Sequence, residues 1–282
     1  MSKRMSERSE RLEVRKTYKL YIGGAFPRSE SGRSYPVSSP SGELVHAAQA
    51  SRKDVRDAVV AARKAFPGWS SATAYNRGQV LYRIAEMLEG RREQFAAYTS
   101  PAEVDAAIDR WVHYAGWADK YAQVVGSTNP VAGPYFTFSL PEPTGVVGVL
   151  APQDSSLLGL VSVVAPVLVT GNTAIVVAAQ DRPLPAISFA EVLATSDLPG
   201  GVVNLLTGFT DELAPWLASH RDVNALDLTG AEPGARADLQ AAAADNVKRV
   251  YVPRSLDWTA APGLSRLNAF VETKTVWHPI GV

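Results

Sequence analysis

From residue 145 onward, short apolar runs alternate with helical segments, and this alternation limits the possible folds more than any other feature. The runs cover residues 146–150, 174–177, 202–206, 225–228 and 249–252. The helical segments between them lie near 155–169, 184–195, 211–219 and 234–244. Continuous apolar runs are typical of strands buried on both faces, and intervening helices allow such strands to run parallel. The sequence therefore predicts an α/β fold: a Rossmann-like, doubly wound parallel sheet of about five strands.

A helical layer is expected before this sheet. Ser51 and Asp54 have the spacing of a capping box, in which each side chain satisfies a free amide group at the start of a helix. Apolar residues follow at helical spacing, so we expect a helix to begin near Ser51. Pro67 and Gly68 should end it.

The rest of the N-terminal half contains weaker signals. We expect a strand and tight turn over 18–26, a loop over 31–42, a helix over 74–98 and another from Ser100 that includes Tyr121. In 134–143, aromatic and aliphatic residues alternate with polar ones. That pattern favours a strand with one solvated face.

Composition excludes several classes of chemistry. The 282 residues contain no cysteine, which excludes disulfides, zinc–thiolate sites, iron–sulfur clusters and a thiolate nucleophile. The 28 Lys and Arg residues balance 28 Asp and Glu residues, so bulk electrostatics provide no hold on nucleic acid or an anionic membrane. We expect neither as a partner.

The N-terminus has no targeting signal that we recognise. Residues 1–16 are mostly charged or polar and lack the apolar segment of a signal peptide, so we expect a disordered tail. The longest apolar stretch, 157–169, is shorter than the roughly 20 residues that span a bilayer. The expectation is a soluble, cytoplasmic protein.

Known catalytic and metal-binding motifs are missing. The four histidines lack metal-type spacing, so no metal site is expected. Neither a nucleophile elbow, a P-loop nor a G-x-G-x-x-G fingerprint occurs. A glycine-bearing turn at 228–234 follows the fourth apolar run, and its amides could approach a phosphate. A turn that is merely close-packed is the other reading, and the pattern alone favours it.

Several ordered blocks of the sequence resemble the aldehyde dehydrogenase superfamily. They are residues 21–24 (YIGG), 54–69, 115–120 (AGWADK), 142–148 (EPTGVVG), 198–204 (LPGGVVN) and 228–230 (LTG). The match runs over 18–257 and returns at about 267–278. In that family, as the resemblance implies, a cysteine thiolate attacks an aldehyde, an asparagine amide holds the oxyanion, hydride passes to NAD(P), and a glutamate activates water.

The catalytic positions of the family are replaced in this chain. The oxyanion asparagine aligns with Asp154, a carboxylate that would repel a developing oxyanion. The general-base glutamate aligns with Pro253, which cannot take a proton. With no cysteine, the resemblance assigns no catalytic residue.

The cofactor positions have changed as well. A lysine and a glutamate that contact the cofactor ribose align with Val177 and Gln180, and the loss of charged partners should weaken NAD(P) binding. Glu232 stands where a pyrophosphate would lie. Cofactor-binding positions are therefore vestigial at most, and NAD(P) binding is expected to be weak if it occurs; these positions are Pro152, Val177, Gln180, Gly208, Thr229, Gly230 and Ala231.

The same alignment predicts the domain organisation. Residues 17–133 and 144–257 resemble the NAD(P)-binding domain, while 134–143 and 267–280 resemble oligomerisation strands. A short linker, 258–266, takes the place of the catalytic domain. The chain thus resembles the degenerate second copy found in two-copy family members.

Loss of chemistry with retention of the assembly strands favours a catalytically inactive subunit. We expect it to pair with a full-length aldehyde dehydrogenase paralogue, or with itself, in a structural or regulatory role. The alternatives are residual NAD(P) binding or altered oxidoreductase chemistry, ordinary aldehyde dehydrogenase activity, and a relic without function. Asp154, Gln180 and Glu232 can also be read simply as solvated residues of an unused groove.

Overall fold

The computed structural model describes residues 16–253 and 256–281. Its centre is a five-stranded parallel sheet in the order β7-β6-β5-β8-β9. The strands are β5 (Val146–Leu150), β6 (Thr173–Val177), β7 (Val203–Leu206), β8 (Ala225–Asp227) and β9 (Arg249–Tyr251). The predicted doubly wound sheet is confirmed. In chain order, β6 and β7 are added on one side of β5, and β8 and β9 are then added on its other side. The strand order therefore reverses beside β5.

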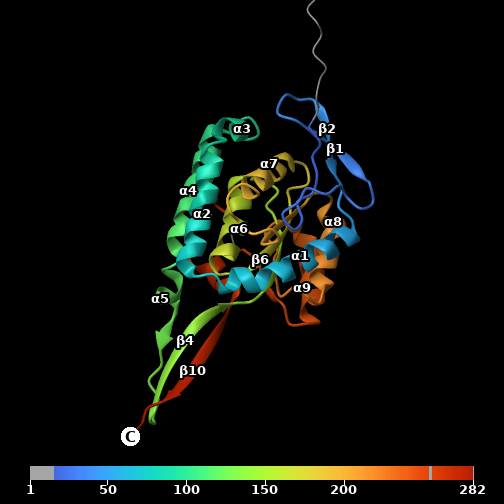
Figure 1. Ribbon diagram of the computed structural model, residues 1–282. Helices are drawn as coiled ribbons and strands as arrows, with labels where there is room; N and C mark the ends of the chain where they lie inside the picture. The colour runs from blue at the N-terminus through green and yellow to red at the C-terminus, as the bar shows by residue number, and fades with distance from the viewer. Residues whose placement is uncertain (1–15, 254–255, 282) are drawn as a thin grey trace, which may run out of the picture.

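Helices cover both faces of this sheet (Figure 1). The crossovers are α6 (Leu158–Val169), α7 (Leu184–Leu193), α8 (Thr210–Ser219) and α9 (Arg236–Ala244), the last preceded by the 3₁₀ turn Pro233–Ala235. Alternate strand residues enter two separate apolar cores. Val147 and Val149 pack in the core with α6 and α7, whereas Val146 and Leu150 pack in the core with α8 and α9.

The N-terminal layer is divided between the same two cores. It consists of α1 (Arg52–Ser71), α2 (Ala74–Glu89), α3 (Arg92–Ala96), α4 (Pro101–Trp117) and α5 (Tyr121–Val125). Val55, Ala58, Val59 and Ala62 of α1 join the core with α8, whereas Trp69 of α1 and the buried residues of α2 and α4 join the core with α6. The N-terminal helices therefore pack against the helices on both faces of the sheet, α6 on one face and α8 on the other.

The prediction that Pro67 and Gly68 end the first helix is wrong, because α1 continues to Ser71. Trp69 lies beyond the proline, is 2% exposed, and donates from its indole Nε1 to Leu168 O at 3.2 Å. Burial of this large ring offsets the one backbone hydrogen bond that a proline removes.

Two other helix boundaries also differ from prediction. The helix expected over 74–98 ends at Glu89, and α3 begins at Arg92 after Gly90. Arg92 binds Asp105 of α4 at 2.6 Å, which holds α3 against the next helix. The third helix ends at Trp117, so Tyr121 belongs to the separate short helix α5.

The loop expected over 31–42 contains the first strand and the turn of a β-hairpin. Strands β1 (Ser34–Ser38) and β2 (Leu44–Ala48) pair antiparallel, and Tyr35 and Val37 of β1 are buried against α7. Buried and exposed residues alternate along β1, but the segment is rich in Ser and Gly, so this alternation is not recognisable from the sequence. In 18–26 the tight turn is confirmed, but the strand is reduced to isolated bridges, such as that between Tyr21 and Leu205.

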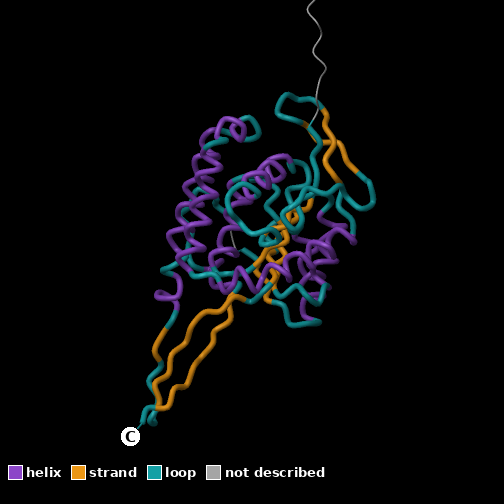
Figure 2. The backbone as a smooth tube through the Cα atoms, in the orientation of Figure 1, coloured by secondary structure: helices purple, strands orange, loops and turns teal. Residues whose placement is uncertain are grey.

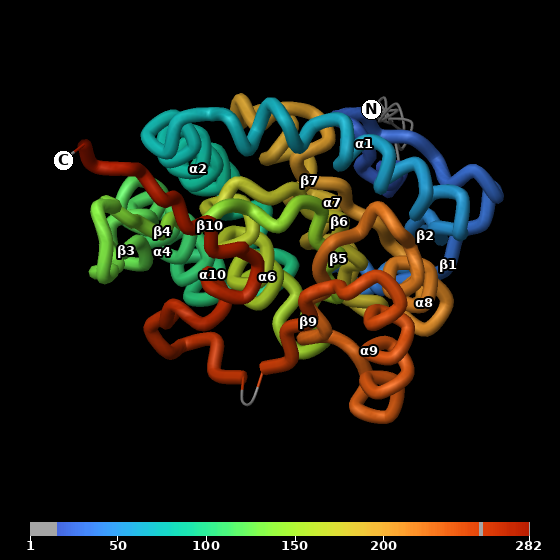
Figure 3. The backbone as a smooth tube through the Cα atoms, turned by 90° about the horizontal axis from the view of Figure 1, so that it is seen from below, coloured from blue at the N-terminus to red at the C-terminus, as the bar shows by residue number. Residues whose placement is uncertain are grey.

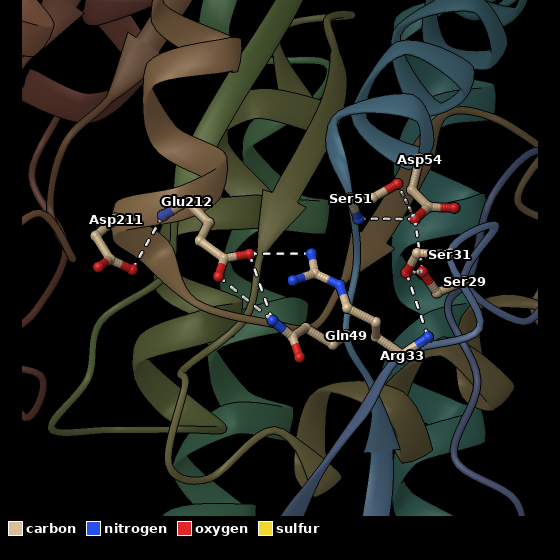
Figure 4. Close-up of polar contacts among 8 residues, drawn as sticks. All are labelled: Ser29, Ser31, Arg33, Gln49, Ser51, Asp54, Asp211 and Glu212. Carbon is tan, nitrogen blue, oxygen red and sulfur yellow. Dashed lines mark hydrogen bonds and ion pairs between the residues drawn. The ribbon is translucent and has the colours of Figure 1, made fainter.

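Side-chain contacts fix the N-terminal segment to α1 and α8 (Figure 4). Ser51 N donates to Asp54 Oδ2 at 2.7 Å, which confirms the capping box. Asp54 is 3% exposed and also accepts bonds from Ser29 Oγ (2.9 Å) and Glu30 N (3.0 Å). Nearby, Glu212 of α8 accepts a bond from Arg33 at 3.1 Å.

A second sheet projects from the body as a long ribbon (Figures 1 and 2). Strands β4 (Tyr135–Pro143) and β10 (Val271–Pro279) pair antiparallel along their whole length, and the short β3 (Ser127–Thr128) pairs with β4 on its other side. The strand predicted over 134–143 is confirmed. The strand expected over 267–280 begins later, because α10 (Ser265–Ala269) buries Leu267 in the core first.

Two expectations concern the ends of the chain and the membrane. The tail expected over 1–16 lies outside the described residues, except for Lys16, whose ammonium is 2.7 Å from the Glu191 carboxylate. Within the described residues, no helix has the length and apolar character that a bilayer span requires.

We predict that Asp54→Ala destabilises the protein. The substitution leaves the donors around a buried site without their acceptor, which should cost about 2 kcal/mol or more. The midpoint of urea unfolding, followed by far-UV circular dichroism, measures the effect. Asp57→Ala in the same helix removes only an exposed ion pair with Arg56 and is the matched control. Equal midpoints for the two variants would contradict this role for Asp54.

Candidate functional site

The predicted site residues all lie at or just beyond the carboxyl ends of the parallel strands. Pro152 and Asp154 follow β5, Val177 ends β6, and Gln180 lies just beyond it. The remaining positions are Gly208 after β7, Thr229, Gly230 and Ala231 after β8, and Pro253 after β9. In open α/β sheets this edge holds the ligand, at the point where strand order reverses. The fold thus brings the sequence-predicted positions to one edge.

The turn after β8 is packed directly against the loop after β5. A Cβ atom on Gly230 would lie 1.9 Å from Ala151 O, so only glycine fits there. The amides of this turn already have acceptors. Gly230 N donates to Leu150 O at 2.9 Å, Thr229 N to Asp227 Oδ1 at 3.0 Å, and Ala231 N to Leu228 O at 3.1 Å. This geometry corresponds to the close-packed turn and leaves none of these three amides for a phosphate.

The N-terminus of α6 is occupied by a carboxylate of the protein itself. Glu103 of α4 accepts bonds at Oε1 from Ser155 Oγ (3.0 Å), Leu158 N (3.2 Å) and Leu157 N (3.4 Å). A helix N-terminus carries free amides and positive potential, so it is the usual place for a ligand phosphate in this architecture. Here Glu103 takes that place. No motif in the sequence predicted this role for Glu103.

The loops after β5 and β6 are bonded to each other. Gln180 N donates to Gln153 Oε1 at 2.8 Å, and Arg182 donates to Asp154 O at 2.6 Å. Val177 is fully buried and offers no polar atom to a ribose. Gly208 has φ +143°, a conformation that favours glycine, and packs against Ala50.

A cavity of about 400 Å³ lies beside Gln180. Tyr35 and Phe209 line it with ring centroids 5.3 Å apart, and the Tyr35 hydroxyl donates to Gln180 O at 3.2 Å. Burial raises the pKa of Tyr35 above its ordinary value. The wall is mainly apolar, and the N-terminal hairpin supplies part of it.

Residues 256–264 fold back over the carboxyl edge of the sheet. Asp154 is exposed and accepts a bond from Trp258 Nε1 at 3.1 Å. Arg110 of α4 donates to Trp258 O at 2.7 Å and to Ala260 O at 3.2 Å. Asp154 therefore helps to hold this segment, while Pro253 lines the cavity beneath it.

A buried ion pair, not predicted from the sequence, fastens the same segment to the sheet. Asp227 at the end of β8 is fully buried and accepts a bond from Arg266 Nη1 of α10. Arg266 also donates to Thr229 Oγ1 at 3.1 Å and stacks 4.6 Å above the Tyr251 ring. Seen from below, α10 lies beside α6 and β9 (Figure 3). In the sequence, this ion pair is indicated only by Asp227, a single aspartate within the apolar run 225–228.

Several polar groups at this edge are already bonded within the protein. The amides of Thr229, Gly230 and Ala231 have acceptors, Glu103 caps α6, and Glu232 is an exposed carboxylate in the same turn. A polyanion bound here would meet the like charge of these carboxylates. Within the described residues, no group of three or more acidic or histidine side chains could hold a metal ion.

We predict that Asp227→Ala costs about 3–5 kcal/mol, because it leaves the buried Arg266 charge without a partner. The double variant Asp227→Ala with Arg266→Met should recover much of that loss, since it removes the orphaned charge. Thermal unfolding of the single and double variants measures the coupling. Additive effects of the two substitutions would contradict the assigned ion pair.

Comparison with known proteins relates this geometry to a family. The profile of the Aldehyde dehydrogenase family matches residues 26–253. Aldehyde dehydrogenase, cytosolic 1 of Elephantulus edwardii is 34% identical over 248 residues, covering 82% of this chain and 49% of that protein. Human retinal dehydrogenase 2 is 34% identical over 255 residues, covering 85% and 48%. Aldehyde dehydrogenase family 2 member B4 of Arabidopsis thaliana is 35% identical over 246 residues, covering 82% and 45%.

Solved structures also share the fold of this chain. The NAD+ complex of an aldehyde dehydrogenase from Bacillus cereus aligns with a TM-score of 0.78 at 26% identity, covering 83% of this chain and 50% of that one. HpcC from Thermus thermophilus aligns with a TM-score of 0.78 at 32% identity, covering 83% and 47%. The chain therefore spans about half the length of its relatives. On sequence and fold together, this chain belongs to the aldehyde dehydrogenase family.

Proposed function

We propose that this chain is a catalytically inactive member of the family that acts as a structural or regulatory subunit of a full-length aldehyde dehydrogenase. The observation that carries the proposal is the absence of cysteine from the 282 residues. The resemblance to the family also aligns the general base with Pro253, which cannot take a proton. Neither covalent attack on an aldehyde nor activation of water has a side chain to perform it.

The carboxyl edge supports the same proposal. In place of an oxyanion donor, Asp154 holds the indole of Trp258. Glu103 and the bonded amides of Thr229, Gly230 and Ala231 leave little for a dinucleotide to bind. Any NAD(P) binding would therefore be weak. Residual oxidoreductase chemistry gains no support from these contacts.

The ribbon supplies the surface that the subunit role requires. In the β4–β10 pair, Thr144 N donates to Phe270 O at 3.2 Å, and Ile280 N donates to Pro134 O at 2.8 Å. Bonding alternates along an antiparallel pair, so the even-numbered residues of β10 bond to β4. Odd-numbered residues, such as Thr273, then present their backbone groups outward.

This outer edge of β10 is unpaired in the structure of the single chain, within the described residues. Aromatic side chains stand exposed along the ribbon: Trp277 at 58%, Phe136 at 48% and Tyr135 at 44%. An open edge with large apolar neighbours is suited to strand addition. We propose a full-length aldehyde dehydrogenase paralogue, or a second copy of this chain, as the strand donor.

The first prediction of this proposal concerns activity. The purified chain should reduce neither NAD nor NADP in the presence of aliphatic or aromatic aldehydes. Calorimetry at about 1 mM of either cofactor should detect no binding, because the amides of Thr229, Gly230 and Ala231 and the N-terminus of α6 are already bonded within the protein. A full-length aldehyde dehydrogenase assayed in parallel is the positive control. Aldehyde-dependent reduction by the chain alone would refute the inactive-subunit proposal.

The second prediction concerns assembly. Thr273→Pro removes one outward N–H from the edge of β10, where a proline is tolerated without breaking the β4 ladder. It should reduce co-purification with a co-expressed full-length aldehyde dehydrogenase, or self-association measured by light scattering. Thr273→Val keeps the N–H and the side-chain size, so it should assemble normally. If both variants assemble like the parent chain, this edge is not the interface.

A further inference from the structure

A cavity of about 360 Å³ lies between the start of α1 and the end of α8, away from the carboxyl edge of the sheet. Its polar and aromatic lining consists of Arg52, Arg56, Trp216, Ser219, His220 and Arg221. Within the described residues, no acidic side chain lines it, whereas Asp181 lines the cavity beside Gln180 and Asp257 lines the one near Pro253. Basic and acidic residues balance over the whole chain, so this gathering of arginines is local.

Arg52 is held in place by an aromatic ring instead of a carboxylate. Its guanidinium carbon lies 4.3 Å from the centroid of the Trp216 ring, and none of the ion pairs among the described residues includes it. Stacking leaves the N–H groups at the edge of the guanidinium free to donate. Because the stacked side chain is already ordered, it would lose little further entropy when it binds an anion.

Arg221 and His220 add further donors. Arg221 is exposed, and its guanidinium forms no hydrogen bond or ion pair with any described residue. Asp222 N donates to His220 Nδ1 at 3.2 Å, so the neutral imidazole carries its proton on Nε2. Arg56 is the arginine of this lining that has a carboxylate partner, Asp57, at 2.9 Å. The cavity therefore presents guanidinium groups without partners and an imidazole N–H.

The pKa of His220 reports the charges behind this lining. Burial lowers the pKa below its ordinary value, and the positive charges of Lys248 and Arg63 lower it further. Asp222 acts in the opposite direction without cancelling the shift. The positive charge therefore extends from the rim of the cavity to the residues beneath it, and a bound anion would be attracted by both.

We propose that this cavity binds a small organic phosphate monoester. A phosphoryl group carries nearly two negative charges at neutral pH and only accepts hydrogen bonds, so it suits several guanidinium donors better than a carboxylate does. Arginine clusters bind phosphoryl groups because the planar fork matches two of their oxygens. Trp216 is 40% exposed and offers an apolar surface to the organic part. A volume of about 360 Å³ suits a small molecule.

Calorimetry on the full chain tests the proposal, with phenyl phosphate as the probe. Benzenesulfonate has a similar shape but a single charge, and it should bind about tenfold more weakly at equal ionic strength. Inorganic phosphate lacks the ring that contacts Trp216 and should also bind more weakly. Absence of binding by phenyl phosphate at about 1 mM, or equal affinity for it and for either competing anion, would overturn the assignment.

Variants of the two arginines without carboxylate partners locate the site. Arg221→Met should raise the dissociation constant of phenyl phosphate about tenfold, through loss of a bond between charged groups. It should leave the melting temperature unchanged, because this guanidinium has no partner in the free protein. Arg52→Lys keeps the charge but loses the planar fork, so it should weaken binding as well. Arg83→Met, an exposed arginine of α2 paired with Glu86, is the control and should bind normally. Unchanged affinity in both Arg221→Met and Arg52→Lys would refute the proposal.

NMR titration of the histidines gives an independent readout in the parent protein. Bound phenyl phosphate should raise the pKa of His220, because its charge opposes that of Lys248 and Arg63. His113 on α4, whose pKa burial and Arg110 hold below the ordinary value, does not line this cavity and should titrate as in the free protein. A His220 pKa that stays the same with saturating phenyl phosphate would place the ligand elsewhere and overturn the assignment.

Discussion

Burial of β5 on both faces is the constraint on which the rest of the structure depends. Its residues alternate between two apolar cores, and Gly148 gives room for Leu226 of the neighbouring strand, whose Cδ2 would lie 2.9 Å from a Cβ atom. A strand in this position must have helices above and below it and strands on either side. The N-terminal helices and the reversal of strand order follow from that requirement.

Polar groups at the carboxyl edge of this sheet form hydrogen bonds and ion pairs with other groups of the protein. In this architecture the edge ordinarily leaves helix N-termini and turn amides free for a ligand. In this chain Glu103 caps α6, Gly230 packs against Ala151, and the Arg266–Asp227 pair fastens the returning segment. Polar groups that are bonded within the protein gain little from a ligand, because binding would first have to break those bonds. The fold is retained, and these polar groups at its carboxyl edge are bonded within the protein.

The ribbon and the carboxyl edge favour the same functional role. In a single chain, the nine-residue strands β4 and β10 extend from the body and leave Trp277 and Phe136 exposed to solvent. Such a surface gains stability when a partner covers it. Together with the missing nucleophile, this arrangement supports the proposal that the role of the chain is assembly.

The parallel sheet and the capping box could be read from the sequence alone, because they follow from local patterns. The replacements at Asp154 and Pro253 rest on the resemblance to the family and stay predictions. The continuation of α1 through Pro67 could not, since the distant packing of Trp69 outweighs a local helix-stop signal. The same holds for the pairing of Arg266 with Asp227, 39 residues away in the sequence. Pairings between distant positions leave no periodic trace in a single sequence, so folding must bring the residues together before their chemistry can be read.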